Sequence, residues 1–546
     1  MKNTPKILLL FIALISINFL ASKFYKRLDL TKDKRYTLSK TTIDIVDNLD
    51  ENAIIKVYLE GDFPSEFKRL QKETRQHLEE LYAINSNIKY KFIDPLDSAE
   101  ELIKKGLQPS RLSVQEDGKL SEAVIFPWAT ITYKDKTENI NLLVDVSIDN
   151  QEEQLQNSIE NLEFAFTEAI HKVSSEKNQT VAILKGNGEL DDIYLASFLS
   201  QLNQYYKLAP FTLDSVANQP QKTLEQLSNF DLTIIAKPQE KFTEEEKFTL
   251  DQYITNGGKT LWLIDNVTAE LDSLTNTGQS LAFNKDLNLT DLLFSYGVRI
   301  NYDLIRDAYS ATIRLADGNV GNKTQFKDYI WHYYPFITSK NDHPITKGVD
   351  PVNLKFANTI DTLKNNSITK TVLLQSSNFS KPIGSPVIIS LEEIAKKPQK
   401  EDYNKGFQTL GVLLEGDFTS AYKNRVKPFE TPIYKEKSEP NKMVVIADGD
   451  IIANELVKGQ PIELGVDKYT GVRYGNSEFL MNTINYLLDD SGLLKLRNKK
   501  IQLQFLDKEK AYTERTYWQI INVIVPLVIL LVFGLVFTFL RKRRFS

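Results

Sequence analysis

The stretch DLTIIA, Asp231 to Ala236, is the part of the sequence that best indicates the fold. It is almost wholly apolar, as expected of a strand buried on both faces of a parallel sheet. A segment of helical length, Glu244 to Thr255, follows and ends at Gly257 and Gly258, which is typical of a helix C-terminus. The next apolar run, TLWLI from Thr260 to Ile264, has the strand pattern again. This alternation predicts an α/β fold.

The same alternation continues on both sides of this stretch. Predicted strands lie at 181–184 and 443–447, and a predicted packing helix lies at 477–488. Residues 300–440 are strand-rich with many turn signals, which indicates insertions between the last strands. We therefore expect one α/β unit over residues 176–490.

An earlier α/β unit is predicted over residues 23–175. Its expected elements are strands at 54–60 and 88–93, a helix at 66–84, a hairpin of 124–133 with 138–144, and a helix at 152–173. The polar link Ser174 to Gln179 separates it from the next unit. A chain of 546 residues exceeds what one hydrophobic core usually organises, which agrees with two units.

The C-terminal end carries an apolar segment from Trp518 to Leu540 without a single charge. At about 1.5 Å per residue it spans roughly 35 Å, enough to cross the hydrocarbon core of a bilayer. The basic cluster Arg541 to Arg544 follows directly and predicts a cytoplasmic tail, residues 541–546. We expect a juxtamembrane segment at 491–517 and a transmembrane helix at 518–540.

The N-terminal end also carries an apolar run, Ile7 to Ala21, after two lysines. Cleavage after Ala21 or Ser22 would place Phe19 or Leu20 at the −3 position, where a small residue is needed. An uncleaved anchor over residues 1–22 is therefore favoured over a cleavable signal. With two spans, both termini lie in the cytoplasm and the bulk of the chain lies in the periplasm. Basic residues between 23 and 35 oppose this orientation, but that rule is weak beside long translocated domains.

Composition excludes several function classes. There is no cysteine, so structural disulfides, thiolate metal sites and cysteine nucleophiles are excluded. The 67 basic and 72 acidic residues are finely mixed, so no basic stripe for nucleic acid is present. The four histidines, His77, His171, His332 and His343, lack metal-ligand spacing.

Glycine motifs do not indicate a nucleotide site. Gly258-Lys259-Thr260 resembles the end of a phosphate loop, but it follows a helix and precedes a strand, the reverse of that motif. Gly186-Asn187-Gly188 does follow a strand, yet Asp191 stands where a dinucleotide fingerprint needs its third glycine. We expect Asp191 and Asp192 to cap the next helix instead. The sequence predicts no cofactor.

One set of residues remains a candidate site, namely Glu189, Asp265, Asp448 and Asp450. Each follows a predicted strand. Because ligands of open parallel sheets bind at the carboxyl ends of the strands, these acids are candidates for a cleft that binds a cation or a sugar. The alternative, which we weight more heavily, is that they cap the helices that follow.

Three stretches resemble a known family. They are Leu28 to Ser39 (LDLTKDKRYTLS), Asn341 to Gly348 (NDHPITKG) and Tyr486 to Arg497 (YLLDDSGLLKLR). They resemble the GldG family, the gliding-motility ABC-transporter auxiliary proteins of the Bacteroidetes, within the uncharacterised ABC auxiliary family. The resemblance runs over nearly the whole chain and says nothing of mechanism.

The resemblance implies a place beside an ABC permease and its ATPase in the inner membrane. It also implies that the second unit has the Rossmann-like fold of class I glutamine amidotransferases, shared with an intraflagellar-transport protein. Those enzymes use a cysteine nucleophile, which this chain lacks.

The predicted function is a non-enzymatic auxiliary or coupling subunit of an inner-membrane ABC transporter complex associated with gliding motility. Other envelope or gliding-machinery proteins are further expected partners. The alternative is a periplasmic component that binds a solute or glycan and presents it to the permease. The aromatic run Tyr329 to Phe336 favours this alternative if its rings stack on sugars, although such a run more often packs a core.

Overall fold

The computed structural model describes residues 29–545 apart from 30, 32–33, 35, 62–64, 117–118, 145–150, 176, 322, 340–342, 396–398, 490–491, 494–495 and 497–507. The N-terminal anchor predicted at 1–22 lies outside these residues. Two compact units make up the chain, Met1–Lys500 and Ile501–Ser546. The predicted boundary near residue 175 falls inside the first unit and stays a prediction.

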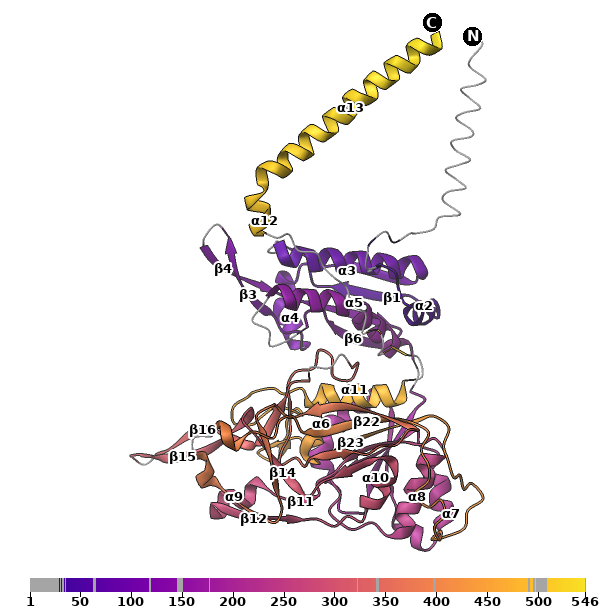
Figure 1. Cartoon of the computed structure of the whole chain (residues 1–546), viewed down its shortest axis with the longest axis vertical. Helices are drawn as coiled ribbons and strands as arrows, with labels where there is room; N and C mark the ends of the chain where they lie inside the picture. Colours follow the sequence, from indigo (N-terminus) through magenta and orange to yellow (C-terminus); the bar gives the residue numbers. More distant parts are fainter. Residues whose placement is uncertain are drawn as a thin grey trace. The chain divides into compact units, whose positions relative to one another are not determined.

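The largest sheet of the first unit has seven strands, all formed by residues after Gln179 (Figure 1). In spatial order its strands are β19 (Ile368–Gln375), β22 (Thr409–Gly416), β23 (Asn441–Ile446), β10 (Lys259–Leu263), β9 (Leu232–Ala236), β7 (Thr180–Lys185) and β8 (Lys207–Thr212). The five strands from β23 to β8 are parallel, whereas β22 and β19 pair antiparallel. The strands predicted around DLTIIA are therefore confirmed.

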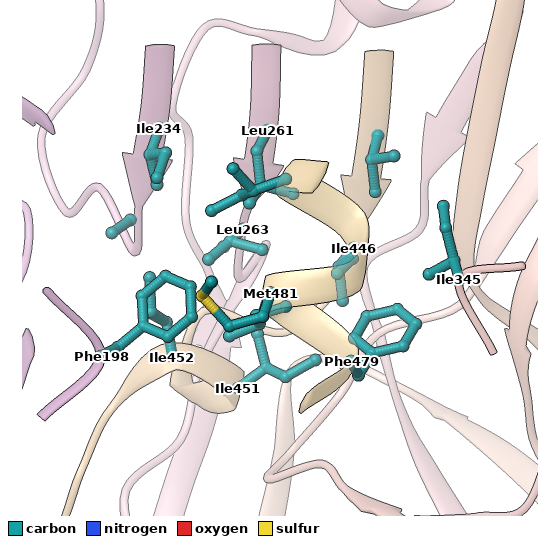
Figure 2. Packing of buried hydrophobic residues seen from close by; sticks show 14 of the residues in the cluster. Phe198, Ile234, Leu261, Leu263, Ile345, Ile446, Ile451, Ile452, Phe479 and Met481 are labelled. Atoms are coloured by element: carbon teal, nitrogen blue, oxygen red, sulfur yellow. The ribbon is translucent and has the colours of Figure 1, made fainter. Parts of the chain in front are cut away.

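Helices cover both faces of this sheet. One face carries α6 (Asp192–Leu202) and α11 (Asn476–Leu488), and the other carries α7 (Pro220–Leu227), α8 (Glu244–Thr255) and α10 (Thr290–Tyr296). Adjacent residues of β9 face opposite layers, Ile234 toward α6 and α11 and Ile235 toward α8. Figure 2 shows part of the first layer, where Phe198, Phe479 and Met481 belong to the same buried cluster as Ile234 and Leu261. Every residue of β9 is buried, as its apolar sequence predicts.

Local sequence explains where α8 begins and ends. Thr243 and Glu246 form a reciprocal capping box at its first turn. At its end Gly257 adopts a left-handed φ of 105°, and a Cβ on Gly258 would lie 2.3 Å from the ring of Tyr253. The glycine pair is therefore a helix terminus, as predicted, because both positions require glycine.

A strand-rich region lies between β10 and β23 and overlaps the predicted range 300–440, although β19 and β22 of that range belong to the seven-stranded sheet. Its strands are β11 (Val267–Thr268), β12 (Gln279–Asn284), β13 (Val298–Ile300), β14 (Asp303–Asp307), β15 (Ser310–Val320), β16 (Lys323–Ile337), β17 (Val352–Asn353), β18 (Ile360–Thr362), β20 (Ser380–Gly384) and β21 (Val387–Ser390). Its short helices are α9 (Leu271–Thr277), η3 (Leu391–Ala395) and η4 (Lys400–Asp402), and η5 (Asp450–Ile452), β24 (Leu456–Val457) and β25 (Gln460–Pro461) follow β23. The long hairpin of β15 and β16 projects from the body of this region (Figure 1).

The N-terminal part of the first unit contains a separate four-stranded sheet. Its strands, in spatial order, are β2 (Ile88–Phe92), β1 (Ala53–Val57), β5 (Trp128–Tyr133) and β6 (Lys136–Asn141). The other elements are α2 (Lys40–Asp47), α3 (Ser65–Ile84), η1 (Leu96–Ser98), α4 (Ala99–Lys104), α5 (Gln151–Ser174) and the hairpin of β3 (Ser110–Glu116) and β4 (Lys119–Ile125). The long helices α3 and α5 are confirmed to within one residue of the predicted bounds.

The second unit contains α12 (Lys508–Thr513) and the long helix α13 (Arg515–Phe545). Among the described residues, α13 is the one helix long and apolar enough to cross a membrane. Its most apolar 18-residue stretch has a mean hydropathy of 3.0, and none of that stretch is buried. The predicted span 518–540 lies within it. A C-terminal helix with the length and composition of a membrane anchor is thus present.

Candidate functional site

Three of the four predicted acids come together at the carboxyl end of the seven-stranded sheet. Asp265 follows β10, and Asp448 and Asp450 follow β23. These two strands are parallel neighbours, so their ends lie side by side. The Asp265 carboxylate accepts a hydrogen bond of 2.6 Å from the backbone N–H of Gly449, which ties the two strand ends together.

The centre of this group is a lysine that the sequence analysis did not select. Lys237 follows β9, and its ammonium lies 2.6 Å from Asp450, 2.9 Å from Glu270 and 3.9 Å from Asp265. Its side chain is 7% exposed, so these carboxylates replace water as its partners. The structure therefore places a buried cation among the predicted acids.

Burial and charge shift the pKa values of the group. Burial together with the neighbouring carboxylates Asp450 and Asp265 raises the pKa of Asp448 well above its ordinary value. Burial also raises the pKa of Asp265 to about 6, although Lys237 opposes the shift. Burial alone would lower the pKa of Lys237, but Asp450, Asp265 and Glu270 together raise it above its ordinary value. Lys237 therefore stays charged.

Backbone groups complete the cluster. Asp448 is fully buried and accepts hydrogen bonds of 2.7 Å from the N–H groups of Asp450 and Lys355. The contact with Asp450 is a local turn before η5, whose N-cap residue is Gly449, so the capping alternative stays a prediction for Asp448. The Lys355 ammonium bonds to Glu455 at 2.9 Å and bounds a cavity of about 20 Å³, with room for one water molecule.

Glu189 lies apart from this cluster, so the prediction of one four-acid cleft is wrong for it. Its carboxylate accepts a hydrogen bond from the N–H of Asn187 in the loop after β7. In the described part of the chain, Glu189 Oε1 and Asn187 Oδ1 are buried without a hydrogen-bond partner. Asp191 does occupy the N-cap position of α6 and Asp192 lies in its first turn, as expected, but the Asp191 side chain makes no capping hydrogen bond.

The crevice of this sheet is closed by the backbone. In a doubly wound sheet the ligand site lies where the strand order reverses, here between β7 and β9. The N–H groups of Gln239 and Glu240, after β9, both donate to the carbonyl of Asn187, after β7, at 2.8 and 2.9 Å. The Leu190 N–H also bonds to the Ala236 carbonyl at 3.1 Å. These contacts fill the position where a ligand would enter.

The cluster has the chemistry of an internal ion network. Among the described residues, no group of three or more His, Asp or Glu side chains has an arrangement that could hold a metal ion. The two short contacts of Lys237, 2.6 and 2.9 Å, are charge-assisted hydrogen bonds of its ammonium with carboxylates. Lys237 could have been found from the sequence by the same rule as the acids, because it directly follows the DLTIIA strand.

A polar groove runs along α5 and was not predicted. Three cavities of about 410, 420 and 420 Å³ share Glu168 and Lys172 of α5 in their walls. The opposite wall includes Glu478 and Asn485 of α11. The Lys172 ammonium lies 3.3 Å from Glu168 and 3.5 Å from Glu138, and a bond of 3.2 Å from the Tyr205 hydroxyl to Glu138 crosses the groove.

The aromatic run 329–336 mainly packs a core. Trp331, Tyr333 and Tyr334 are buried in a cluster with Phe356. Their rings therefore do not form a platform for sugars, and the core-packing alternative is correct for these three residues.

One comparison with known proteins identifies the family of the chain. The family described as ABC-type uncharacterized transport system, ABC_transp_aux, matches residues 178–483, more than half of the chain. A second family, described as a domain of unknown function (DUF7088), matches residues 32–132. The chain belongs to the ABC-type transport system auxiliary family.

A relative and a solved structure are among the proteins similar to the chain. An uncharacterized protein of Borreliella burgdorferi is 22% identical over 530 residues, covering 95% of this chain and 94% of that protein. A solved structure titled mmIFT52 N-terminal domain is 17% identical, covers 57% of this chain and 99% of its own, and has a TM-score of 0.32.

Proposed function

We propose that this protein is a non-enzymatic auxiliary subunit of an inner-membrane ABC transport system, acting through protein contacts. Membership of the ABC auxiliary family supports the association with transport. The apolar helix α13 supports attachment to the membrane. The partners are an ABC permease and its ATPase, the bulk of the chain lies in the periplasm, and both termini lie in the cytoplasm.

The observation that supports the non-enzymatic role is that the carboxyl end of the sheet is closed by hydrogen bonds and ion pairs of the chain itself. Enzymes with open parallel sheets use this end to bind substrate or cofactor. Here Asn187 is bonded across the crevice, and Lys237 is ion-paired with the adjacent acids Asp450 and Asp265. We retain the expectation of an amidotransferase-like fold from which the cysteine nucleophile is missing.

The association with gliding motility is the finer part of the proposal. It rests on the resemblance of three stretches to the GldG family. One of them has a definable structural role, because the Asp29 carboxylate accepts hydrogen bonds from the N–H groups of Thr31 and Tyr36, each at 2.9 Å. These bonds tie Asp29 to Thr31 and Tyr36 ahead of α2.

The test is purification of the tagged full-length protein from native membranes in mild detergent. Recovery of a permease and an ABC ATPase at a fixed ratio is the expected result. A matched variant in which the α13 residues Leu530 and Leu531 are both replaced by arginine should lose both partners, because charges at the bilayer centre oppose insertion. Recovery of the protein alone would contradict the proposal.

The groove along α5 favours a second candidate, the binding of a solute or glycan. Its cavities fall within the size range of small-molecule sites and are lined by apolar side chains together with amide and carboxylate groups. If this second candidate is correct, a glycan co-purifies with the protein, whether or not the ABC partners are recovered. Replacing Asn485 with leucine should then abolish glycan recovery while leaving any permease bound.

A further inference from the structure

The ammonium of Lys237 is held as a bound ligand would be held. Its partners come from three separate parts of the chain, namely Asp265 after β10, Asp450 in η5 and Glu270 before α9. The two short contacts, 2.6 and 2.9 Å, are charge-assisted hydrogen bonds of ordinary length. The carboxylate cage is therefore built around a primary ammonium.

The alkyl stem of Lys237 also has a fitted site. A Cβ on Gly449 would lie 2.5 Å from Cγ and 2.6 Å from Cβ of Lys237, so this stem occupies the space above Gly449. The Asp265 carboxylate fixes Gly449 from the other side through its N–H. Both the charged head and the apolar stem thus have their own contacts.

The backbone conformation at Lys237 is independent of its side chain's chemistry. Lys237 has a φ of 56°, in the left-handed region that glycine adopts without strain. Its N–H bonds to the Leu263 carbonyl at 2.9 Å, which holds the residue on the sheet. A glycine at this position removes the side chain without disturbing the backbone.

We propose that the carboxyl end of the sheet is a primary-alkylammonium site which Lys237 occupies in cis as a built-in ligand. The lysine neutralises the acids that hold the ends of β10 and β23, and it keeps the site closed to ligands from solution. Once the side chain is removed, the same site binds free n-butylammonium, which has the same carbon and nitrogen atoms as the missing side chain. A metal ion is not expected in its place, because among the described residues no group of three or more His, Asp or Glu side chains has an arrangement that could hold one.

The experiment measures thermal unfolding of the full-length protein in detergent, with and without 20 mM n-butylammonium chloride, a concentration on the order of that needed for a weak site. Lys237→Gly should lower the Tm by about 5 °C or more, and n-butylammonium should restore at least half of the loss. Equal concentrations of sodium, magnesium or tetramethylammonium chloride should restore none of it. The unsubstituted protein should respond to none of these salts.

Lys237→Met is the matched control, since its stem fills the site without supplying charge. It should lose stability as Lys237→Gly does but gain nothing from n-butylammonium. In the double variant Lys237→Gly/Asp450→Asn, the n-butylammonium concentration needed for a given rise in Tm should be at least threefold higher than in Lys237→Gly. If Lys237→Gly fails to fold alone, refolding in n-butylammonium should recover it.

Three results would overturn the proposal. The first is an unchanged Tm of Lys237→Gly, which would mean that the acids need no ammonium. The second is a loss that n-butylammonium does not reverse, during heating or refolding. The third is an equal response of Lys237→Met or of the unsubstituted protein, which would mean a non-specific effect of the salt.

Discussion

At the scale of single residues, Lys237 and Gly449 illustrate how closely two strand ends are packed. Lys237 leaves β9 with a φ of 56°, a conformation that costs a residue with a side chain of order 1 kcal/mol or more. The surrounding contacts hold it there, since its ammonium is bound by Asp450 and Glu270. Its stem lies where any side chain at position 449 would lie.

Gly449→Ala should therefore destabilise the protein by overpacking. Gly449 has a φ of −79°, which alanine adopts freely, so the effect is steric and not conformational. The expected loss is about 1–3 kcal/mol in the free energy of unfolding, measured by chemical denaturation. Gly384→Ala is the control, because a Cβ there meets nothing within 4 Å, and it should change stability by less than about 0.5 kcal/mol.

The raised pKa of Asp265 predicts a pH dependence of stability. Its folded-state pKa of about 6 lies above the value of about 3.9 expected when unfolded, so the folded protein binds the proton more tightly. The stability that this tighter proton binding contributes to the folded state is complete below about pH 4 and is lost as the pH rises through about 6. A difference of roughly two units at about 1.4 kcal/mol each gives up to about 3 kcal/mol.

Asp265→Asn isolates this effect from other titrating groups. The difference in unfolding free energy between the unsubstituted protein and Asp265→Asn should shift by up to about 3 kcal/mol between pH 4 and pH 7, in favour of the variant at the higher pH. Denaturant unfolding at four pH values measures it. Parallel curves for the two proteins would show that Asp265 does not titrate in this range.

At the scale of elements, the sequence predicts what local chemistry determines. The helix Glu244–Thr255 is found with the predicted bounds because its capping box and terminal glycines are both local signals. The strands around DLTIIA follow from their unbroken apolar runs. The pairing of β19 and β22 at the edge of the sheet could not be predicted, since register depends on contacts between segments distant in sequence.

Replacing the cap of α8 tests how far a local signal stabilises the whole unit. Thr243→Ala removes the side-chain acceptor for the Glu246 N–H, which should cost about 1 kcal/mol. Thr243→Ser keeps a hydroxyl and should cost much less. Chemical denaturation of both variants measures the difference, and equal stability of the two would mean that the cap contributes nothing.

The candidate site was likewise predictable where local sequence determines it, and not where it depends on contacts between distant segments. Asp265, Asp448 and Asp450 were predicted because each follows a buried strand and parallel strand ends meet. The closure of the crevice was not predictable, since it depends on two backbone N–H groups that bond to Asn187 from a loop some fifty residues away. The groove along α5 was missed for a related reason, because helices far apart in sequence form its walls.

At the scale of the whole molecule, the question is on which side of the membrane each part lies. The basic cluster after Leu540 predicts a cytoplasmic C-terminus and a periplasmic bulk. The chain contains no cysteine, so any thiol label reports only on an introduced residue. Val426, whose side chain is 93% exposed, is a suitable position in the first unit.

Val426→Cys should react with a membrane-impermeant maleimide in intact spheroplasts, because it would lie in the periplasm. Phe545→Cys, after the basic cluster of α13, should react only after the membrane is permeabilised. Labelling is measured as a mobility shift on a gel, and a variant with neither substitution should stay unlabelled. Labelling of Phe545→Cys in intact spheroplasts, with Val426→Cys protected, would invert the topology and remove the periplasmic domain from the proposed complex.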